Sequence, residues 1–258
     1  MTKVYLKYLF KNPMFYICIL LVTGTAIFQM INRNIGTGNS LFYAQNSAVT
    51  SIDILLLFNF ERKIFAFLSA IPFNARFSSE WLSNSKYYIV ARKNADGYIR
   101  SHLIVCCISS FLVVALGLTI YSVIISANVS LYNSNDPVLG FEGLFEKGYY
   151  IAYLALKIIF YSLSNTLWCV CGLLSSVFFT NTYIALCSPF IFGFIIENLT
   201  YHFPQGINVF AHSTGTALVG KSVTVQIILS FLFWAITISA VGFLFIKFAR
   251  RKILNANS

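Results

Sequence analysis

Long apolar runs dominate this sequence, and they restrict the folds open to the chain more than any other feature does. Met14–Ile31, Leu103–Ile125, Tyr149–Phe179 and Val223–Ile246 each approach or exceed the ~20 residues with which a helix crosses a bilayer. Tyr183–Ile196 is a shorter run of the same kind. Only 10% of all residues are charged, against about 25% in soluble domains. The sequence therefore predicts an all-α, multi-pass membrane protein.

The segment from Ile54 to Phe77 gives the weakest apolar signal among the predicted spans. The charged triplet Glu61-Arg62-Lys63 divides it, and its later part contains Pro72. The triplet indicates either a polar vestibule on the outer side or a loop boundary. A span is favoured here, because without it the basic segment 76–102 would lie across the membrane from the basic N-terminus. The predicted total is then six spans.

Positive charge gathers in three polar segments. Residues 1–12, 76–102 and 247–258 hold twelve Lys/Arg and two acids, and so carry the whole net charge of +10. Cytoplasmic loops of membrane proteins are enriched in Lys and Arg. Both termini and the 76–102 loop are therefore predicted to face the cytoplasm, with residues 126–148 and 197–222 outside. The positive charges flank apolar runs, so they indicate contact with a membrane and not with nucleic acid.

The first twelve residues are predicted to form an interfacial helix. Lysines recur there at four-residue spacing, which places them along one side of a helix and leaves apolar residues for lipid. Asn12 can cap the next helix, and Pro13 suits its first turn. The lysines are Lys3, Lys7 and Lys11, and the apolar residues are Val4, Leu6 and Leu9.

The 76–102 segment is predicted to contain a short amphipathic helix at the membrane surface. Ser78 or Ser79 can cap its start, with Glu80 in the first turn, where the helix dipole favours an acid. No Pro or Gly interrupts residues 80–92, and residues 94–97 are typical of a turn. The alternative is an ordinary basic loop. The residues that share one face of the predicted helix are Trp81, Leu82, Tyr88 and Ile89.

Two residues within the apolar runs are candidates for a translocation pathway. Lys157 lies about 12 Å inside the fourth run, where a charge is costly. It either faces a pathway, pairs with Glu61 or Glu146, or extends its side chain to the interface, which is the interpretation we favour. Pro189 breaks the short fifth run, and discontinuous helices occur near transport sites. The loop after it, 197–222, is either fully exterior or dips back into the membrane.

Two apparent functional signals are expected to carry no function. Gly215–Ser222 matches the nucleotide-binding pattern G-x-x-x-x-G-K-[ST]. The match is expected to be accidental, because a membrane span follows it and the segment is predicted to lie outside. The six cysteines all fall within apolar runs, so neither a disulfide nor a zinc site is expected.

The six spans, the basic N-terminal helix and the basic helical loop together resemble the ABC-2 type permeases, the membrane subunits of ATP-driven exporters. In that family an acid, a small residue, an aromatic-rich helix, an Arg and a Tyr follow the second span. Ser85 stands where Gly is common in the family, and His102 stands where Lys is common. The sub-group most similar is the compact Gram-positive permeases for peptide export or immunity, such as phenol-soluble-modulin exporters. The matching positions here are Glu80, Ser85, Tyr87-Tyr88, Arg92 and Tyr98.

The resemblance implies a function and a set of partners. The chain, one permease domain over residues 1–258, would pair with a second copy or a paralogous permease, with its first and fifth spans near the two-fold axis. A separate cytoplasmic ABC ATPase would bind ATP and Mg, so this chain would need no cofactor or catalytic residue. The substrate would be an amphipathic or antimicrobial peptide, crossing the bacterial cytoplasmic membrane. The alternatives are a non-transporting immunity or assembly factor and a membrane-embedded enzyme. The coupling residues implied are Glu80, Trp81, Ser85, Tyr88 and Arg92.

Overall fold

The computed structural model describes residues 1–36, 47–57, 59–83, 95–133, 140–179, 181–218 and 222–255. Regular structure in these stretches is helical, which confirms the predicted all-α class. The helices are α1 (Thr2–Lys11), α2 (Pro13–Gly36), α3 (Ala48–Leu57), α4 (Asn59–Ala70), α5 (Ala75–Leu82), α7 (Ala95–Ser126), α8 (Glu142–Glu146), α9 (Tyr150–Phe178), α10 (Thr182–Tyr201), α11 (Val209–Thr214) and α12 (Val223–Asn255).

Five helices in the described part of the chain are long and apolar enough to cross a membrane. They are Pro13–Asn32 within α2, Val223–Leu254 within α12, and the whole of α7, α9 and α10. Each corresponds to one of the apolar runs in the sequence. The chain is therefore a multi-pass membrane protein.

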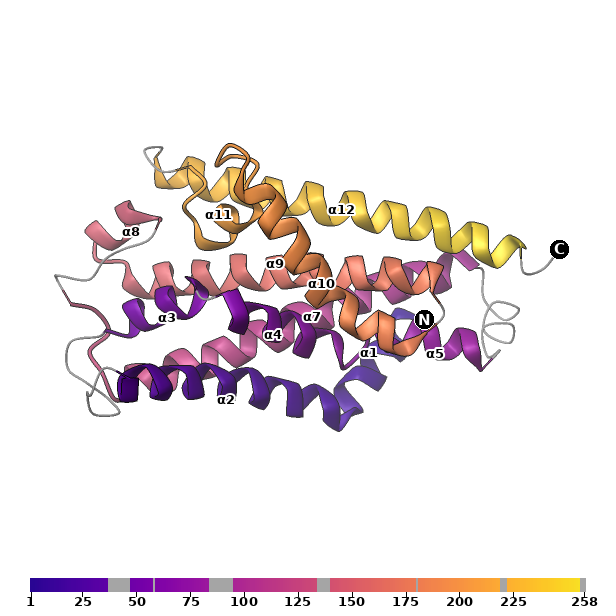
Figure 1. The fold of residues 1–258 in the computed structure, drawn as a ribbon, viewed down its shortest axis with the longest axis horizontal. Helices are drawn as coiled ribbons and strands as arrows, with labels where there is room; N and C mark the ends of the chain where they lie inside the picture. The colour runs from indigo at the N-terminus through magenta and orange to yellow at the C-terminus, as the bar shows by residue number, and fades with distance from the viewer. Residues whose placement is uncertain are drawn as a thin grey trace.

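The predicted second span is not one long helix. α3 ends at Leu57, α4 begins at Asn59, and a turn at residues 71–74 that contains Pro72 precedes α5. Proline cannot continue a helix as an ordinary interior residue does, because it lacks the backbone donor. Figure 1 shows that α3 and α4 together carry the chain back from the end of the bundle where α2 finishes to the end where α5 lies. Six spans remain a prediction, in which these two short helices form one pass.

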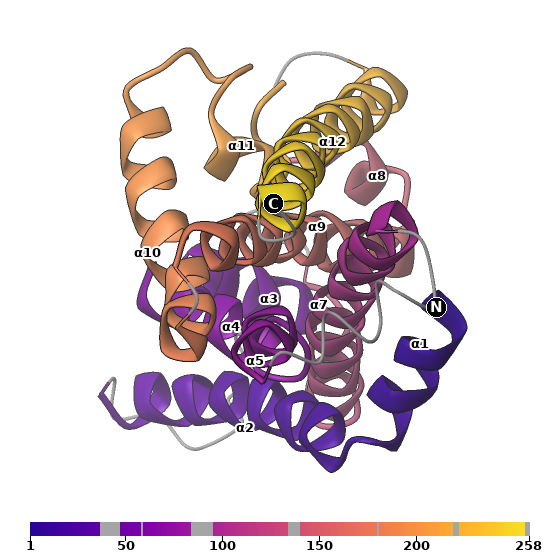
Figure 2. The ribbon, with the colours of Figure 1, turned by 90° about the vertical axis from the view of Figure 1, so that its right-hand side faces the viewer.

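Helix α9 is the centre of the bundle. It packs against α7, α10, α12 and α11, and the end-on view in Figure 2 shows it surrounded by its neighbours. Its sequence suits this position because small and hydroxyl-bearing residues let neighbouring helices approach closely. Polar side chains in α9 bond to its own backbone, as Asn165 does to the carbonyl of Tyr161 and Thr166 to that of Ser162. The buried small and polar residues of α9 include Ser162, Ser164, Asn165, Thr166, Gly172, Ser175 and Ser176.

The basic segments of the sequence meet at one end of the bundle. Figure 1 places α1, α5 and the last turns of α12 at the same end. The Thr2 hydroxyl lies 3.1 Å from that of Ser101, joining α1 to α7, and Arg250 lies 3.5 Å from Asp96, joining α12 to α7. We call this the basic end. The charge asymmetry in the sequence thus corresponds to a spatial one.

Helix α1 occupies the segment expected to be interfacial. The Asn12 side chain accepts from the Met14 backbone N–H at 3.1 Å, so Asn12 caps α2 as expected, and Pro13 is the first residue of that helix. The lysines and Val4 are exposed, but Leu9, expected to face lipid, is fully buried in the protein core with Tyr5. Helix α1 is therefore packed onto the bundle.

The predicted start of the surface helix at Ser78 or Ser79 is wrong, and the part of that predicted helix beyond residue 83 lies outside the described residues. α5 begins at Ala75 and ends at Leu82, so Ser78 is buried within the helix and Glu80 lies near its C-terminal end. The local capping signal is overridden because Glu80 binds side chains from other helices. Residues 95–97, predicted to be a turn, form the first turn of α7, where Asp96 suits the helix dipole.

The fifth span is longer than predicted and is not broken. α10 is a continuous helix with Pro189 inside it, and it continues past the expected end at Ile196 to Tyr201. Glu197, assigned from sequence to a loop, is a buried residue of this helix. The extension is explained by Arg62 and Lys63, the two basic side chains that bind Glu197 within the bundle.

Close contact between α9 and α10 depends on Gly172. A Cβ at this position would lie 2.6 Å from Pro189 Cγ and 2.9 Å from Asn74 Nδ2. Gly172→Ala should therefore cost about 1–3 kcal/mol of stability through overpacking. Gly24→Ala is the matched control, because nothing lies within 4 Å of its Cβ; the change should be neutral, or favourable by up to about 1 kcal/mol. Thermal unfolding in detergent measures both, and equal melting temperatures for the two variants would contradict the prediction.

Candidate functional site

The first of two buried charge networks joins α4 to α10. Arg62 Nη2 donates to Glu197 Oε1 at 3.0 Å and to Ser213 Oγ at 3.0 Å. Lys63 binds the other oxygen of Glu197 and also donates to the carbonyl of Gly193 at 3.0 Å. All three charged side chains are buried. We call these residues the α4–α10 network. It has two cations for one carboxylate, and the Arg62 guanidinium also lies 4.3 Å from the centre of the Phe210 ring.

The second network joins α3 to α9. Lys157 Nζ lies 2.9 Å from Asp53 Oδ1, and both side chains are 1% exposed. Tyr153 donates to Asp53 Oδ2 at 2.5 Å, and Lys157 donates to the carbonyl of Thr214 at 2.7 Å. We call these residues the α3–α9 network. Burial of an ion pair is costly unless both groups are hydrogen-bonded as well as paired, and here they are.

These contacts correct the favoured interpretation of Lys157. Its side chain does not extend to an interface but is held inside the bundle by Asp53. Neither acid considered as a partner takes that place: Glu146 is exposed in α8, and the side chain of Glu61 lies outside the described part. Pro189, the other pathway candidate, is buried where α10 meets Gly172.

The short helix α11 contacts both networks. Ser213 accepts from Arg62 and the next residue, Thr214, accepts from Lys157. Asn208 caps the start of α11 by accepting from the Phe210 and Ala211 backbone N–H groups. This helix belongs to the segment expected to be exterior or re-entrant, and in the structure it is buried against α9, α10 and α3.

The nucleotide-binding pattern begins where α11 ends. Gly215 is the C-cap, with φ +78°, and a Cβ there would lie 2.2 Å from the Phe141 ring, so only glycine fits. A nucleotide-binding loop follows a strand, whereas α11 precedes this one. Lys221 lies outside the described residues.

Glu80 is the centre of a third buried group, at the basic end. Its carboxylate accepts from Arg76 Nε at 2.7 Å, from the Tyr5 hydroxyl at 2.9 Å and from His102 Nε2 at 3.1 Å. Burial alone would raise the pKa of Glu80, but the bonds from His102, Arg76 and Tyr5 outweigh burial and lower this pKa to about 2. Burial raises the pKa of the Tyr5 hydroxyl, so it stays a donor. Glu80 thereby ties α5 to α1 and α7.

Trp81, the next residue, lies beside a shallow apolar cleft. Lys252 is 4.7 Å above the Trp81 ring, and the Phe178 and Phe248 rings are 5.2 Å apart, so the ends of α5, α9 and α12 meet here. The cleft has a volume of about 540 Å³. Phe179 and Tyr183 at its margin are 58% and 77% exposed. We call it the end cleft; it is lined by Leu82, Phe178, Phe179, Asn181, Thr182, Tyr183 and Ile184.

Of the five residues implied to couple to an ATPase, Glu80 and Trp81 lie in the described part. Ser85, Tyr88 and Arg92 lie outside it, as does most of the predicted 80–93 helix. Sequence reasoning did not assign Asp53, Arg62, Lys63, Glu197 or His102 to the positions they occupy. The first four could have been suspected from sequence, because they are charged residues inside or beside apolar runs. A charge within a membrane span costs free energy unless it is paired. No group of three or more His, Cys, Asp and Glu that could hold a metal occurs among the described residues.

The long apolar helices define a multi-pass membrane protein. Two buried charge networks lie between its helices, and an apolar cleft lies at the basic end. Comparison with models of protein families, with curated proteins and with solved structures finds no match.

Proposed function

We propose that this chain is the transmembrane subunit of an ATP-driven exporter whose ATPase is a separate soluble chain. The observation that carries the proposal is the end cleft. It presents exposed aromatic side chains at the basic end, which is predicted to be cytoplasmic, and it adjoins α5, from which the 80–93 segment continues. Buried aromatic anchors supply much of the binding energy at protein interfaces. A soluble partner could therefore dock here.

A route from this cleft to the membrane interior supports coupling. α5 is tied to α1 and α7 through Glu80, and it follows α4 after one short turn. α4 in turn holds α10 through the α4–α10 network. Movement imposed on α5 would thus act on α10, and a second copy or a paralogous permease would complete the pathway. An amphipathic peptide remains the proposed substrate, and the bacterial cytoplasmic membrane the proposed location.

Binding of the ATPase tests this proposal. Tyr183→Ala should weaken recovery of the purified partner ABC ATPase by about 30-fold, because loss of an aromatic anchor costs on the order of 2 kcal/mol. Trp81→Ala should weaken recovery to a similar degree. Tyr201→Ala is the matched control, since Tyr201 is an exposed tyrosine at the opposite end of the same helix.

The pull-down is done in detergent, where no bilayer is present. If the cleft aromatics only rest among lipid headgroups, recovery will be equal for wild type and all variants. That result would remove the coupling assignment and favour the non-transporting immunity factor.

A further inference from the structure

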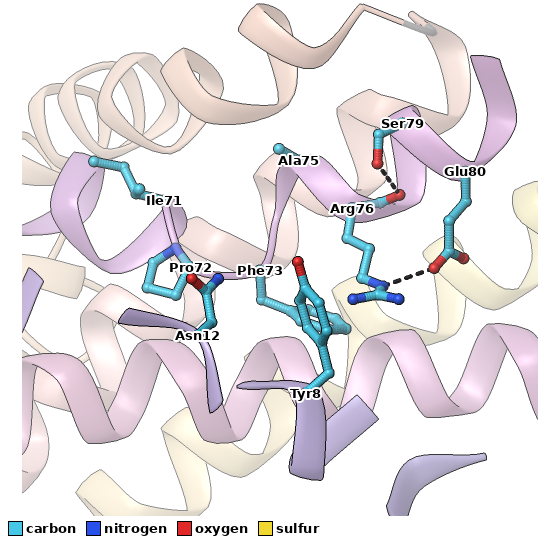
Figure 3. Close-up of a pocket in the computed structure, with 9 residues that line it drawn as sticks. All are labelled: Tyr8, Asn12, Ile71, Pro72, Phe73, Ala75, Arg76, Ser79 and Glu80. Carbon is cyan, nitrogen blue, oxygen red and sulfur yellow. Dashed lines mark hydrogen bonds and ion pairs between the residues drawn. The ribbon is translucent and has the colours of Figure 1, made fainter. Parts of the chain in front are cut away.

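A second pocket at the basic end lies between α1 and the turn that joins α4 to α5. Its volume is about 350 Å³, which is within the range of small-molecule sites. Figure 3 shows Ile71, Pro72 and Asn12 on one side of it and Arg76, Ser79 and Glu80 on the other. The pocket is thus apolar toward Pro72 and polar toward Arg76. Neither the charge networks nor the end cleft includes it.

Arg76 lines this pocket, and only part of its hydrogen-bonding capacity is taken up by the residues that the structure describes. Its Nε is fixed on Glu80 at 2.7 Å, and the guanidinium lies 3.7 Å from the centre of the Tyr8 ring. The terminal nitrogens Nη1 and Nη2 donate no hydrogen bond to the residues that the structure describes. The side chain remains 27% exposed. A guanidinium held in this way presents paired N–H groups to a ligand, and that geometry suits phosphate and carboxylate.

The charge around the pocket favours an anion. Glu80 lines the pocket, but its charge is balanced by Arg76, and its oxygens already accept from Arg76, Tyr5 and His102. Helix α1 carries three exposed lysines and no acid. An anion that approaches from this side therefore meets a positive field.

The surroundings indicate that the anion belongs to a lipid. The pocket includes Asn12, at the junction of α1 with the first membrane span, and Phe10 and Met14 on either side of the junction are exposed. Basic pockets at the ends of membrane helices bind lipid headgroups. We propose that this pocket binds the phosphate group of an anionic phospholipid, held by the terminal nitrogens of Arg76. This inference does not depend on the proposed transport function.

Lipid titration measured by native mass spectrometry tests the proposal. Purified wild-type protein in neutral detergent should bind phosphatidylglycerol about tenfold more tightly than phosphatidylcholine, as expected for one charge-assisted site. Arg76→Gln should lose most of this preference. Lys147→Gln removes an exposed charge next to α8, outside α1 and outside the pocket lining, and it should keep the preference.

A second variant keeps the test decisive if Arg76→Gln fails to fold. Ala75→Phe fills the pocket and leaves the Arg76–Glu80 pair in place, so it should also lose the preference. Inorganic phosphate at millimolar concentration should not displace the bound lipid. Displacement by phosphate would overturn the lipid assignment, and folded Ala75→Phe protein that retains wild-type preference would overturn the site.

Discussion

Replacing Lys157 with methionine should lower the free energy of unfolding by about 3–5 kcal/mol. The change leaves Asp53 charged in the bundle interior, where its side chain is 1% exposed and Tyr153 donates to it. Removing one partner of a buried ion pair is costly because the other partner keeps its desolvation penalty and loses its counter-charge. Thermal or denaturant unfolding of the purified protein in detergent measures the effect.

Two controls separate charge pairing from loss of the side chain itself. The double variant Lys157→Met with Asp53→Leu removes both charges and should recover most of the lost stability, because well-packed apolar replacements of buried pairs are often neutral. Lys147→Met changes an exposed lysine and should have little effect. If the double variant is no more stable than Lys157→Met alone, the ion pair is not the source of the effect.

Glu197→Gln should lower the free energy of unfolding by a similar amount, about 3–5 kcal/mol. In this case the buried groups left without a partner are cations and not an anion. Here one carboxylate serves two cations, so its removal leaves Arg62 and Lys63 facing each other without an acid. The amide still accepts a hydrogen bond, so the expected loss is specific to charge. Because the network holds α10 against α4, the same variant should increase proteolysis near α10 before global unfolding.

Glu142→Gln is the matched control, since Glu142 is an exposed acid in α8. It should melt as the wild type does. Adding Lys63→Met to Glu197→Gln reduces the uncompensated charge by one and should restore part of the stability. Equal melting temperatures for Glu197→Gln and Glu142→Gln would contradict the assignment of Glu197 to a buried network.

The membrane class and the long helices could be predicted because apolar length is a local property of the sequence. Charge partners could not be predicted in this way. Lys157 pairs with Asp53, which is far from it in the sequence. The sequence predicts Glu197 in a loop because an isolated acid at the end of an apolar run usually marks a boundary, whereas Glu197 is a buried residue of α10. The sequence predicts one span over residues 54–77 because the basic segment 76–102 must lie on the same side as the basic N-terminus. The break between α3 and α4 and the tertiary contacts of Arg62 and Lys63 leave no trace in hydropathy.

The contacts at the basic end could not be predicted for the same reason. The family resemblance implies a coupling role for Glu80, and that role stays a prediction. Its contacts in the structure depend on Tyr5 and His102 from other helices, which local capping rules do not include. Tyr183 and the end cleft were missed because a short turn between two spans gave no motif. The remaining coupling residues, Ser85, Tyr88 and Arg92, stay predictions.

The α4–α10 network has a consequence for how the protein is made. Arg62 and Lys63 are synthesised long before Glu197, and each uncompensated charge at the centre of a nascent span costs about 2.5–3.5 kcal/mol during insertion. Asp53 likewise precedes Lys157 along the chain. Stable insertion of α3 and α4 therefore depends on helices that emerge later from the ribosome. A chain truncated before α10 would leave the two cations of α4 without their acid and α4 exposed to membrane quality control.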